Sequence, residues 1–195
     1  MDDAAIIEAS IRDGSAFGEI FERHYDAIAR YARRRVGEAT GEEIAARTFM
    51  IAFEKRHRFD PAATSARPWL YGIATNLIRH HVRDERTHLA ARRRLLVQPV
   101  EPDPNQDVVK LDAQRLRGEL QDALLDLSRG DRDAFLLNVL AELTYEEVAA
   151  SLAIPVGTVR SRIHRARKQL RERISSVAGI EPWTTHVDDD GMGDG

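Results

Sequence analysis

Apolar residues recur along most of this chain at steps of three and four, and no stretch alternates apolar with polar residues as a half-buried strand does. The spacing predicts helices, first over residues 3–12 and then from Ser15, a candidate N-cap, to Val36. Thr40 and Glu43 have the spacing of a capping box, which predicts that a third helix begins at Thr40. The pattern therefore favours an all-α fold.

The remaining predicted helices are interrupted by a segment of a different composition. One helix is predicted to begin near Pro68, where a missing backbone N–H costs little, and to continue to about Arg94. Segment 97–107 then holds three prolines and three acidic residues, which exclude a helix or a core and predict a linker. Beyond it, the spacing predicts four more helices at about residues 113–127, 131–141, 144–152 and 156–174.

Residues 143–173, LTYEEVAASLAIPVGTVRSRIHRARKQLRER, are the most informative stretch. Thr144 and Glu147 form a second capping-box pattern, and Pro155 favours a break before a new helix. That helix buries one face, because its apolar residues follow steps of 4, 3 and 4: Val159, Ile163, Ala166 and Leu170. Its other face is mostly basic. This pattern is typical of a helix-turn-helix, whose second helix fits the DNA major groove. A solvated bundle helix is the alternative, but the capped first helix and the proline break favour DNA binding.

The chain is therefore predicted to form two small helical domains joined by a flexible linker, with the helix-turn-helix in the C-terminal one. The predicted boundaries are an N-terminal domain at 1–95, an acidic proline-rich linker at 96–112, a C-terminal domain at 113–175 and a disordered acidic tail at 176–195.

Charge is distributed unevenly along the chain, although the net charge is only −3. The last fifteen residues carry five acids and no Lys or Arg, and residues 98–114 carry four acids and one Lys. Removing these two segments (−3 + 5 + 3) leaves the patterned remainder at +5. The helical parts are therefore basic, as expected of a protein with a polyanionic partner.

Composition excludes several other classes. The 195 residues contain no Cys, which excludes disulfides, thiolate catalysis and Cys-based zinc sites and favours a cytoplasmic protein. No run of eighteen apolar residues predicts a membrane span, and the acidic N-terminus is unlike a signal peptide. No phosphate-binding loop or nucleophile motif predicts an enzyme or a cofactor.

Four segments, in order, resemble the bacterial extracytoplasmic-function (ECF) RNA polymerase sigma factors. Residues 143–173 resemble the C-terminal promoter-reading domain of that family. FGEIFERHYDAIARYARRRVG, GEEIAARTFMIAFEKRHRFD and ARPWLYGIATNLIRHHVRDERTH resemble the three helical segments of its other domain. The resemblance covers about residues 10–175 and implies a sigma factor: a non-enzymatic protein that binds core RNA polymerase and gives it promoter specificity.

The resemblance also implies which residues contact promoter DNA. The helix-turn-helix would read the −35 element as duplex, and its major-groove contacts would be Thr158, Arg160, Ser161, Arg162 and Arg165. The N-terminal domain would capture the −10 element as single strand. Phe59 would stack on an opened base, and Asp60, Thr64 or Ser65 would bond a base edge, although core packing is an equal alternative for Phe59. A strand-facing patch on the next helix would consist of Asn76, Arg79, His80 and Arg83.

Protein partners follow from the same resemblance. The helix TGEEIAARTFMIAFE resembles the segment that docks on the polymerase clamp, and its outer face would present Glu42, Glu43, Arg47 and Met50. The family often shows Gln-Glu where this chain has Ala46 and Arg47. A base therefore replaces an acid on the surface expected to contact the polymerase clamp. By family habit, an anti-sigma factor would clamp the two domains and cover both DNA-reading faces.

Two alternatives remain beside the sigma-factor reading. His80, His81, Asp84 and His88 share a helix at spacings that suit a metal, but they lack a closed set of ligands, so no metal site is predicted. A free-standing regulator would share the helix-turn-helix but would need a sensor or dimerisation domain. The N-terminal half lacks the strand–helix alternation of a receiver domain.

Overall fold

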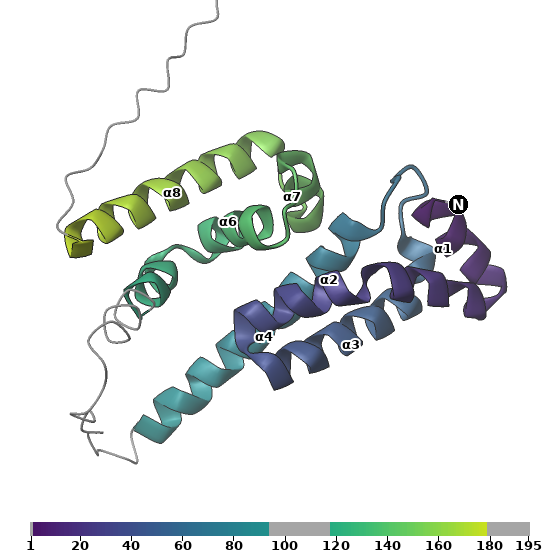
Figure 1. The fold of residues 1–195 in the computed structure, drawn as a ribbon. Helices are drawn as coiled ribbons and strands as arrows, with labels where there is room; N and C mark the ends of the chain where they lie inside the picture. The colour runs from purple at the N-terminus through teal and green to yellow at the C-terminus, as the bar shows by residue number, and fades with distance from the viewer. Residues whose placement is uncertain (1, 94–117, 179–195) are drawn as a thin grey trace, which may run out of the picture.

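The computed structural model describes residues 2–93 and 118–178, and all regular elements within these ranges are helices (Figure 1). The all-α prediction is confirmed. The N-terminal part consists of α1 (Asp3–Arg12), the 3₁₀ helix η1 (Gly14–Phe17), α2 (Gly18–Val36), α3 (Glu38–Lys55), η2 (Arg56–Arg58) and α4 (Arg67–Arg93). The C-terminal part holds a helical segment at 118–126 followed by α6 (Arg129–Leu140), α7 (Tyr145–Leu152) and α8 (Val156–Ala178). The predicted linker and most of the predicted tail lie outside the described residues.

Two predicted helix starts are wrong. Ser15 does not cap α2: it lies in η1, and its backbone N–H donates to the carboxylate of Asp13, which caps that turn. Thr40 and Glu43 do not form a capping box, because α3 already begins at Glu38. The chain reverses at Gly37, whose φ of 86° favours glycine, so the turn and not the Thr40 side chain sets the start of α3.

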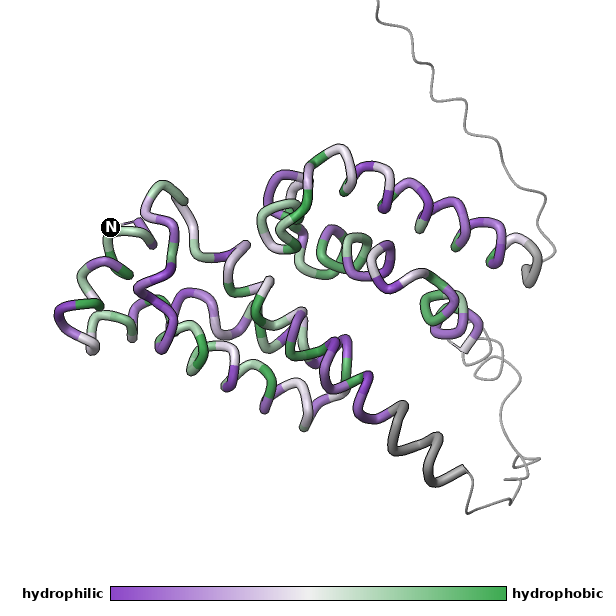
Figure 2. The backbone as a smooth tube through the Cα atoms, turned by 180° about the vertical axis from the view of Figure 1, so that it is seen from behind, coloured by the Kyte–Doolittle hydropathy of each residue, from purple (hydrophilic) through white to green (hydrophobic). Residues whose placement is uncertain are grey.

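The core of the N-terminal part lies between α2, α3 and α4, which pack against one another. Figure 2 shows hydrophobic positions recurring along the facing sides of these helices. Fully buried residues come from each helix: Ile20, Ile28 and Tyr31 from α2, Ile44 and Ala45 from α3, and Leu70 and Ile78 from α4. A Cβ on Gly41 would lie 2.5 Å from the backbone N and Cα of Arg33, so α2 and α3 approach closely there. Phe53 is 38% exposed at the end of α3.

The C-terminal part is not separate from the N-terminal part. Helix α7 packs against α4, and one continuous hydrophobic core contains Leu70 and Ala74 of α4 together with Leu137, Val148 and Ile163 of the C-terminal helices. Figure 1 shows the C-terminal helices on one side of the N-terminal bundle. The two helical parts therefore share a buried interface in this arrangement.

Candidate nucleic-acid interface

The predicted helix-turn-helix is formed by α7 and α8. Thr144 Oγ1 accepts from the Glu147 N–H at 3.2 Å, and the Glu147 carboxylate accepts from the Thr144 N–H at 2.9 Å, so the predicted capping box is confirmed. Helix α7 ends at Ala153, which has a left-handed φ of 52°. The Ile154 N–H then donates to the Ala149 carbonyl, and α8 begins directly after Pro155. The break places a new helix at a sharp angle to α7, as Figure 1 shows.

One face of α8 is buried and the opposite face carries cations. The predicted inward residues are all buried, namely Val159, Ile163, Ala166 and Leu170. On the outer face, Arg160, Ser161 and Arg165 are exposed, whereas Thr158 and Arg162 are half-buried. Arg and hydroxyl side chains on the first turns of such a helix are the groups that contact base edges and phosphates in a major groove.

Two of these arginines are held by the first turn of α6. Arg165 donates to Asp131 from Nη2 at 2.7 Å and from Nε at 3.3 Å. Burial alone would raise the pKa of Asp131, but hydrogen bonds from Arg165 and Ser128 hold that pKa below its ordinary value. A Cβ on Gly130 would lie 2.9 Å from the Arg162 guanidinium carbon, so Arg162 rests on the backbone of Gly130. The α6 turn thus restricts the position of both arginines.

The loop between η2 and α4 carries the candidate base-capturing residues. Phe59 is half-buried and packs on Trp69, with ring centroids 5.2 Å apart. Asp60 is exposed and its carboxylate accepts from the Ala62 N–H at 3.0 Å. Thr64 is exposed, and Ser65 Oγ accepts from the Arg67 N–H at 3.2 Å at the start of α4. The loop therefore brings three hydrogen-bonding groups to one end of α4, beside an aromatic pair.

The end of this loop is tied to the N-terminal helix by a buried carboxylate. Asp3 is 6% exposed, and its oxygens accept from the Ala66 N–H at 2.8 Å and from Arg23 Nη1 at 3.2 Å. His24 Nε2 lies 2.8 Å from the same oxygen that accepts from the Ala66 N–H. Burial opposes ionisation of Asp3, but the Ala66 N–H and His24 outweigh it, so the pKa of Asp3 lies below its ordinary value.

The four residues of the predicted strand-facing patch on α4 differ in their accessibility to solvent. Asn76, His80 and Arg83 are exposed, and Arg83 contacts His80 Nδ1 at 3.2 Å. Arg79 is less accessible, because its Nε donates to Asp133 of α6 at 2.7 Å and its Nη1 donates to Asn76 at 3.2 Å. The structure brings the four residues together on one helix but places Arg79 in a contact with the C-terminal helices.

The outer face of α3 carries the candidate polymerase-binding residues. Met50 is 56% exposed, and Glu43 and Arg47 are exposed and lie 3.6 Å apart as an ion pair. Glu42 differs from the expectation of an outward side chain. It is half-buried and accepts from Arg33 at 2.7 Å and from Tyr25 at 2.8 Å.

Comparison with known proteins identifies the family. Residues 20–88 match the family "Sigma-70 region 2", and residues 117–170 match "Sigma-70, region 4". The chain is 31% identical over 176 residues to the ECF RNA polymerase sigma factor SigW of Bacillus subtilis, covering 85% of this chain and 92% of that protein. It is 34% identical over 162 residues to the ECF sigma factor SigE of Mycolicibacterium smegmatis, of which it spans 62%. The chain belongs to the ECF RNA polymerase sigma factors.

Solved structures show the same architecture. CnrH in complex with the cytosolic domain of CnrY superposes with a TM-score of 0.63 at 25% identity, covering 89% of this chain and 97% of that one. The sigma factor RpoE of Bartonella quintana, in complex with the anti-sigma factor NepR, superposes with a TM-score of 0.58 at 23% identity, covering 82% and 96%. This sigma factor therefore directs promoter-specific transcription initiation, and its helices have the fold seen in its relatives.

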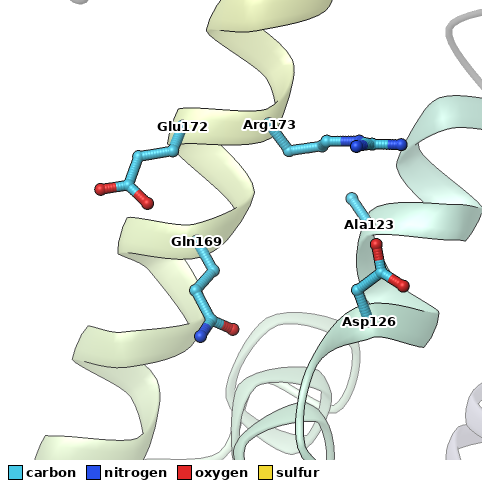
Figure 3. Close-up of a pocket in the computed structure, with 5 residues that line it drawn as sticks. All are labelled: Ala123, Asp126, Gln169, Glu172 and Arg173. Atoms are coloured by element: carbon cyan, nitrogen blue, oxygen red, sulfur yellow. The ribbon is translucent and has the colours of Figure 1, made fainter.

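A shallow pocket lies between the helical segment 118–126 and the C-terminal half of α8, beyond the first turns of α8 that carry the candidate base contacts. It has a volume of about 420 Å³, and Figure 3 shows the side chains that line it: Ala123, Asp126, Gln169, Glu172 and Arg173. These charged and amide groups come from two helices without a nucleophile or a paired acid and base.

Within residues 2–93 and 118–178, no three His, Asp or Glu side chains are grouped to hold a metal ion. The side chain of His88, one of the four residues weighed as metal ligands, lies outside the described part of the structure. None of the helices in these ranges combines the length and apolar content needed to span a bilayer.

The sequence pattern did not point to several residues that shape this sigma factor's DNA-facing surfaces. Asp3, Asp131 and Asp133 are buried acids whose partners lie far along the chain, and spacing within one helix gives no sign of such pairs. Gly72 carried a weak signal: a glycine inside a helical pattern costs about 1 kcal/mol relative to alanine. A Cβ on Gly72 would lie 2.7 Å from the Ser151 carbonyl oxygen.

Proposed function

We propose that this sigma factor reads the −35 element with α8 and the −10 element with α4 and the loop before it. The observation that carries the proposal is the division of α8 into a buried apolar face and an outward face bearing Arg160, Ser161 and Arg165. A helix of this kind after a tight turn enters the major groove. The family matches at 20–88 and 117–170 fall inside the proposed domains at 1–95 and 113–175.

In the proposed −35 complex, the first turns of α8 face the base edges. Thr158 lies in the first turn, and Arg160 and Ser161 follow on the exposed face. Arg162 and Arg165 lie on the side of α8 next to Gly130 and Asp131. An arginine whose position is already restricted loses less conformational freedom on binding, so the α6 turn favours these two contacts.

In the proposed −10 complex, opened bases contact the loop and α4. Asp60, Thr64 and Ser65 supply acceptors and donors for a base edge, and the Phe59–Trp69 pair supplies an aromatic surface. Asn76, Arg79, His80 and Arg83 follow along α4, where cations neutralise the strand's phosphates.

Polymerase and regulator contacts complete the proposal. Glu43, Arg47 and Met50 on the exposed side of α3 would meet the polymerase clamp, and Glu42 would act by holding Arg33. The protein acts in the cytoplasm as a recognition factor and not as an enzyme. Because CnrH and RpoE are seen with CnrY and the anti-sigma factor NepR, an anti-sigma partner is proposed here as well.

The experiment that tests the −35 role compares Arg160→Ala with Arg171→Ala, an exposed arginine on the same helix. Affinity is measured for duplexes with the matched −35 element and with single base changes, at several salt concentrations. Arg160→Ala is expected to reduce discrimination at one base position by roughly 5- to 150-fold, the equivalent of about 1–3 kcal/mol.

Arg171→Ala is expected to leave base discrimination unchanged. Arg160→Ala could instead weaken binding to all duplexes equally and reduce the slope of log affinity against log salt concentration by about 1. Arg160 would then bind the phosphate backbone and would not read a base. Unchanged affinity for matched and altered duplexes would remove Arg160 from the interface.

A further inference from the structure

Helix α8 contacts the first turn of α6 through a buried carboxylate. The Asp131 side chain is 8% exposed, whereas the Arg165 side chain that it binds is 52% exposed. Arg165 Nη2 donates to Asp131 Oδ1 at 2.7 Å, and Arg165 Nε donates to Oδ2 at 3.3 Å. The Asp131 N–H donates to the hydroxyl of Ser128, the N-cap of α6, at 3.2 Å. The carboxylate therefore belongs to a fixed turn and holds one side of an otherwise exposed guanidinium.

This pairing decides which edge of the Arg165 guanidinium remains available. A guanidinium carries five N–H groups in one plane. Asp131 occupies the edge formed by Nε and Nη2. Within residues 2–93 and 118–178, nothing bonds to the other edge, which is formed by Nη1 and the second Nη2 hydrogen. Because two parallel N–H groups match O6 and N7 of guanine, the free edge is the one that can read this base.

The same turn limits the position of Arg162 by shape. A Cβ on Gly130 would lie 2.9 Å from Cζ, 3.0 Å from Nη1 and 3.2 Å from Nε of Arg162. The guanidinium of this half-buried residue therefore occupies space that a larger residue at position 130 would fill. Arg162 and Arg165 are three residues apart and lie on one face of α8. Two neighbouring residues of α6 thus set the positions of two neighbouring arginines of α8.

We propose that Gly130 and Asp131 are positioning residues that determine specificity for the −35 element, acting through Arg162 and Arg165 and not by contact with DNA. The inference rests on the proposed −35 role of α8. An unrestrained arginine follows any phosphate within its reach, which gives affinity without discrimination. An arginine held by an acid has lost part of its rotamer freedom before binding, and its free edge points in one direction. Holding that edge favours the matched base over the others.

The charge of Asp131 acts in the same direction as its geometry. The carboxylate pairs with Arg165 at 2.7 Å and so offsets a cation on the face of α8 that approaches DNA in the proposed complex. This lowers the attraction of α8 for the phosphates of any sequence. A matched duplex recovers free energy through the base contact of the free edge, whereas an altered duplex does not. Asp131 is therefore expected to weaken binding to altered duplexes more than binding to the matched one.

Two variants disturb the positioning by different means. Asp131→Asn keeps the side-chain size but removes the charge and leaves one acceptor oxygen for two N–H groups. Gly130→Ala places a methyl group where the Arg162 guanidinium lies, yet alanine is the better helix former, so α6 itself is not weakened. Each has a matched control. Asp126→Asn removes the charge of an exposed acid in the segment before α6, and Gly18→Ala adds a Cβ that has nothing within 4 Å.

The experiment measures the affinity of the full chain for the matched −35 duplex and for duplexes with single base-pair changes. Arg162→Ala and Arg165→Ala serve as references, because each identifies its own base pair by a loss of discrimination of roughly 5- to 150-fold. Asp131→Asn is expected to lower discrimination at the Arg165 base pair by about 2- to 12-fold, the equivalent of immobilising one long side chain. Its affinity for altered duplexes is expected to stay the same or rise. Gly130→Ala is expected to lower discrimination at the Arg162 base pair, and both controls to leave discrimination unchanged.

A merely structural role gives a different result. If Asp131→Asn lowered the affinity for matched and altered duplexes equally, Asp131 would only stabilise α6, and the proposal would be overturned. An equal gain in affinity for all duplexes would overturn it too, because Asp131 would then only repel phosphates. In a chain that already carries Arg165→Ala, adding Asp131→Asn is expected to cause no further loss of discrimination, and a further loss would contradict the proposal.

The reference variants separate this inference from the proposed function. Unchanged discrimination in both Arg162→Ala and Arg165→Ala would overturn the proposed −35 contacts of these arginines and this inference with them. Normal discrimination in Asp131→Asn and Gly130→Ala, beside a loss in the arginine variants, would overturn the positioning role alone.

Discussion

We expect Gly41→Ala to lower the free energy of unfolding by about 1–3 kcal/mol, although alanine is intrinsically better than glycine in a helix by up to about 1 kcal/mol. The added Cβ would lie 2.5 Å from both the backbone N and the Cα of Arg33, and 2.8 Å from its Cγ. Because two of these atoms belong to the α2 backbone, the clash cannot be relieved by a side-chain rotation. Helices α2 and α3 have to move apart, and the buried contacts between them weaken.

Urea denaturation followed by circular dichroism measures this effect directly. Gly18→Ala is again the matched control, because its Cβ would meet open space and its φ of −54° is ordinary for a helix. The control is expected to be as stable as the parent or slightly more stable. If Gly41→Ala were as stable as Gly18→Ala, the close approach of α2 and α3 would not exist in solution.

Asp3→Ala is expected to lower the free energy of unfolding by about 1–3 kcal/mol near neutral pH. The substitution leaves the Ala66 N–H without its acceptor and removes the anion beside Arg23 and His24. Ala66 directly precedes α4, so the loop that carries Thr64 and Ser65 loses its tie to α1. We therefore expect weaker binding of single-stranded −10 DNA in addition to the loss of stability.

The effect of Asp3→Ala should depend on pH. The pKa of Asp3 is lowered in the folded protein, because hydrogen bonds from Ala66 and His24 outweigh the opposing effect of burial. A depressed carboxyl pKa contributes stability that is complete above the unfolded pKa of about 3.9 and is lost as the pH falls through the lower folded value. The stability difference between parent and variant should therefore shrink below about pH 4.

Denaturation at neutral and acidic pH measures both parts of this expectation. Glu8→Ala serves as the control, because Glu8 is an exposed acid of the same helix. Its effect is expected to remain within about 0.5 kcal/mol. An Asp3→Ala effect as small as that of Glu8→Ala, or one that grows in acid, would contradict the role given to the buried carboxylate.

Much of the helical architecture was predictable because it depends on local spacing. The steps of Val159, Ile163 and Ala166 identify the buried face of α8 without any knowledge of its neighbours. The capping box of Thr144 and Glu147 was also predictable, since its two hydrogen bonds join residues three apart.

The same capping pattern failed at Thr40 for a physical reason. Gly37, with its left-handed φ, lets the chain reverse and enter α3 immediately, before Thr40 is reached. A sequence window contains both signals, and only the geometry of the turn decides between them.

The pairings that shape the candidate site were not predictable from spacing. Arg35 and Asp133 are 98 residues apart, and Arg165 and Asp131 are 34 apart. An acidic residue in the first turn of a helix is ordinarily explained by its favourable interaction with the helix dipole. Here Asp131, in the first turn of α6, and Asp133, just beyond it, receive arginines from other helices, and this follows only from how the helices pack.

The most direct test of the account is run-off transcription with purified core RNA polymerase, a promoter taken from upstream of the protein's own gene, and this protein added or withheld. The account predicts a transcript that appears only when the protein is present and that falls when the −35 element is scrambled. Absence of a transcript, together with salt-sensitive duplex binding by the protein alone, would contradict it and indicate a regulator that acts without polymerase.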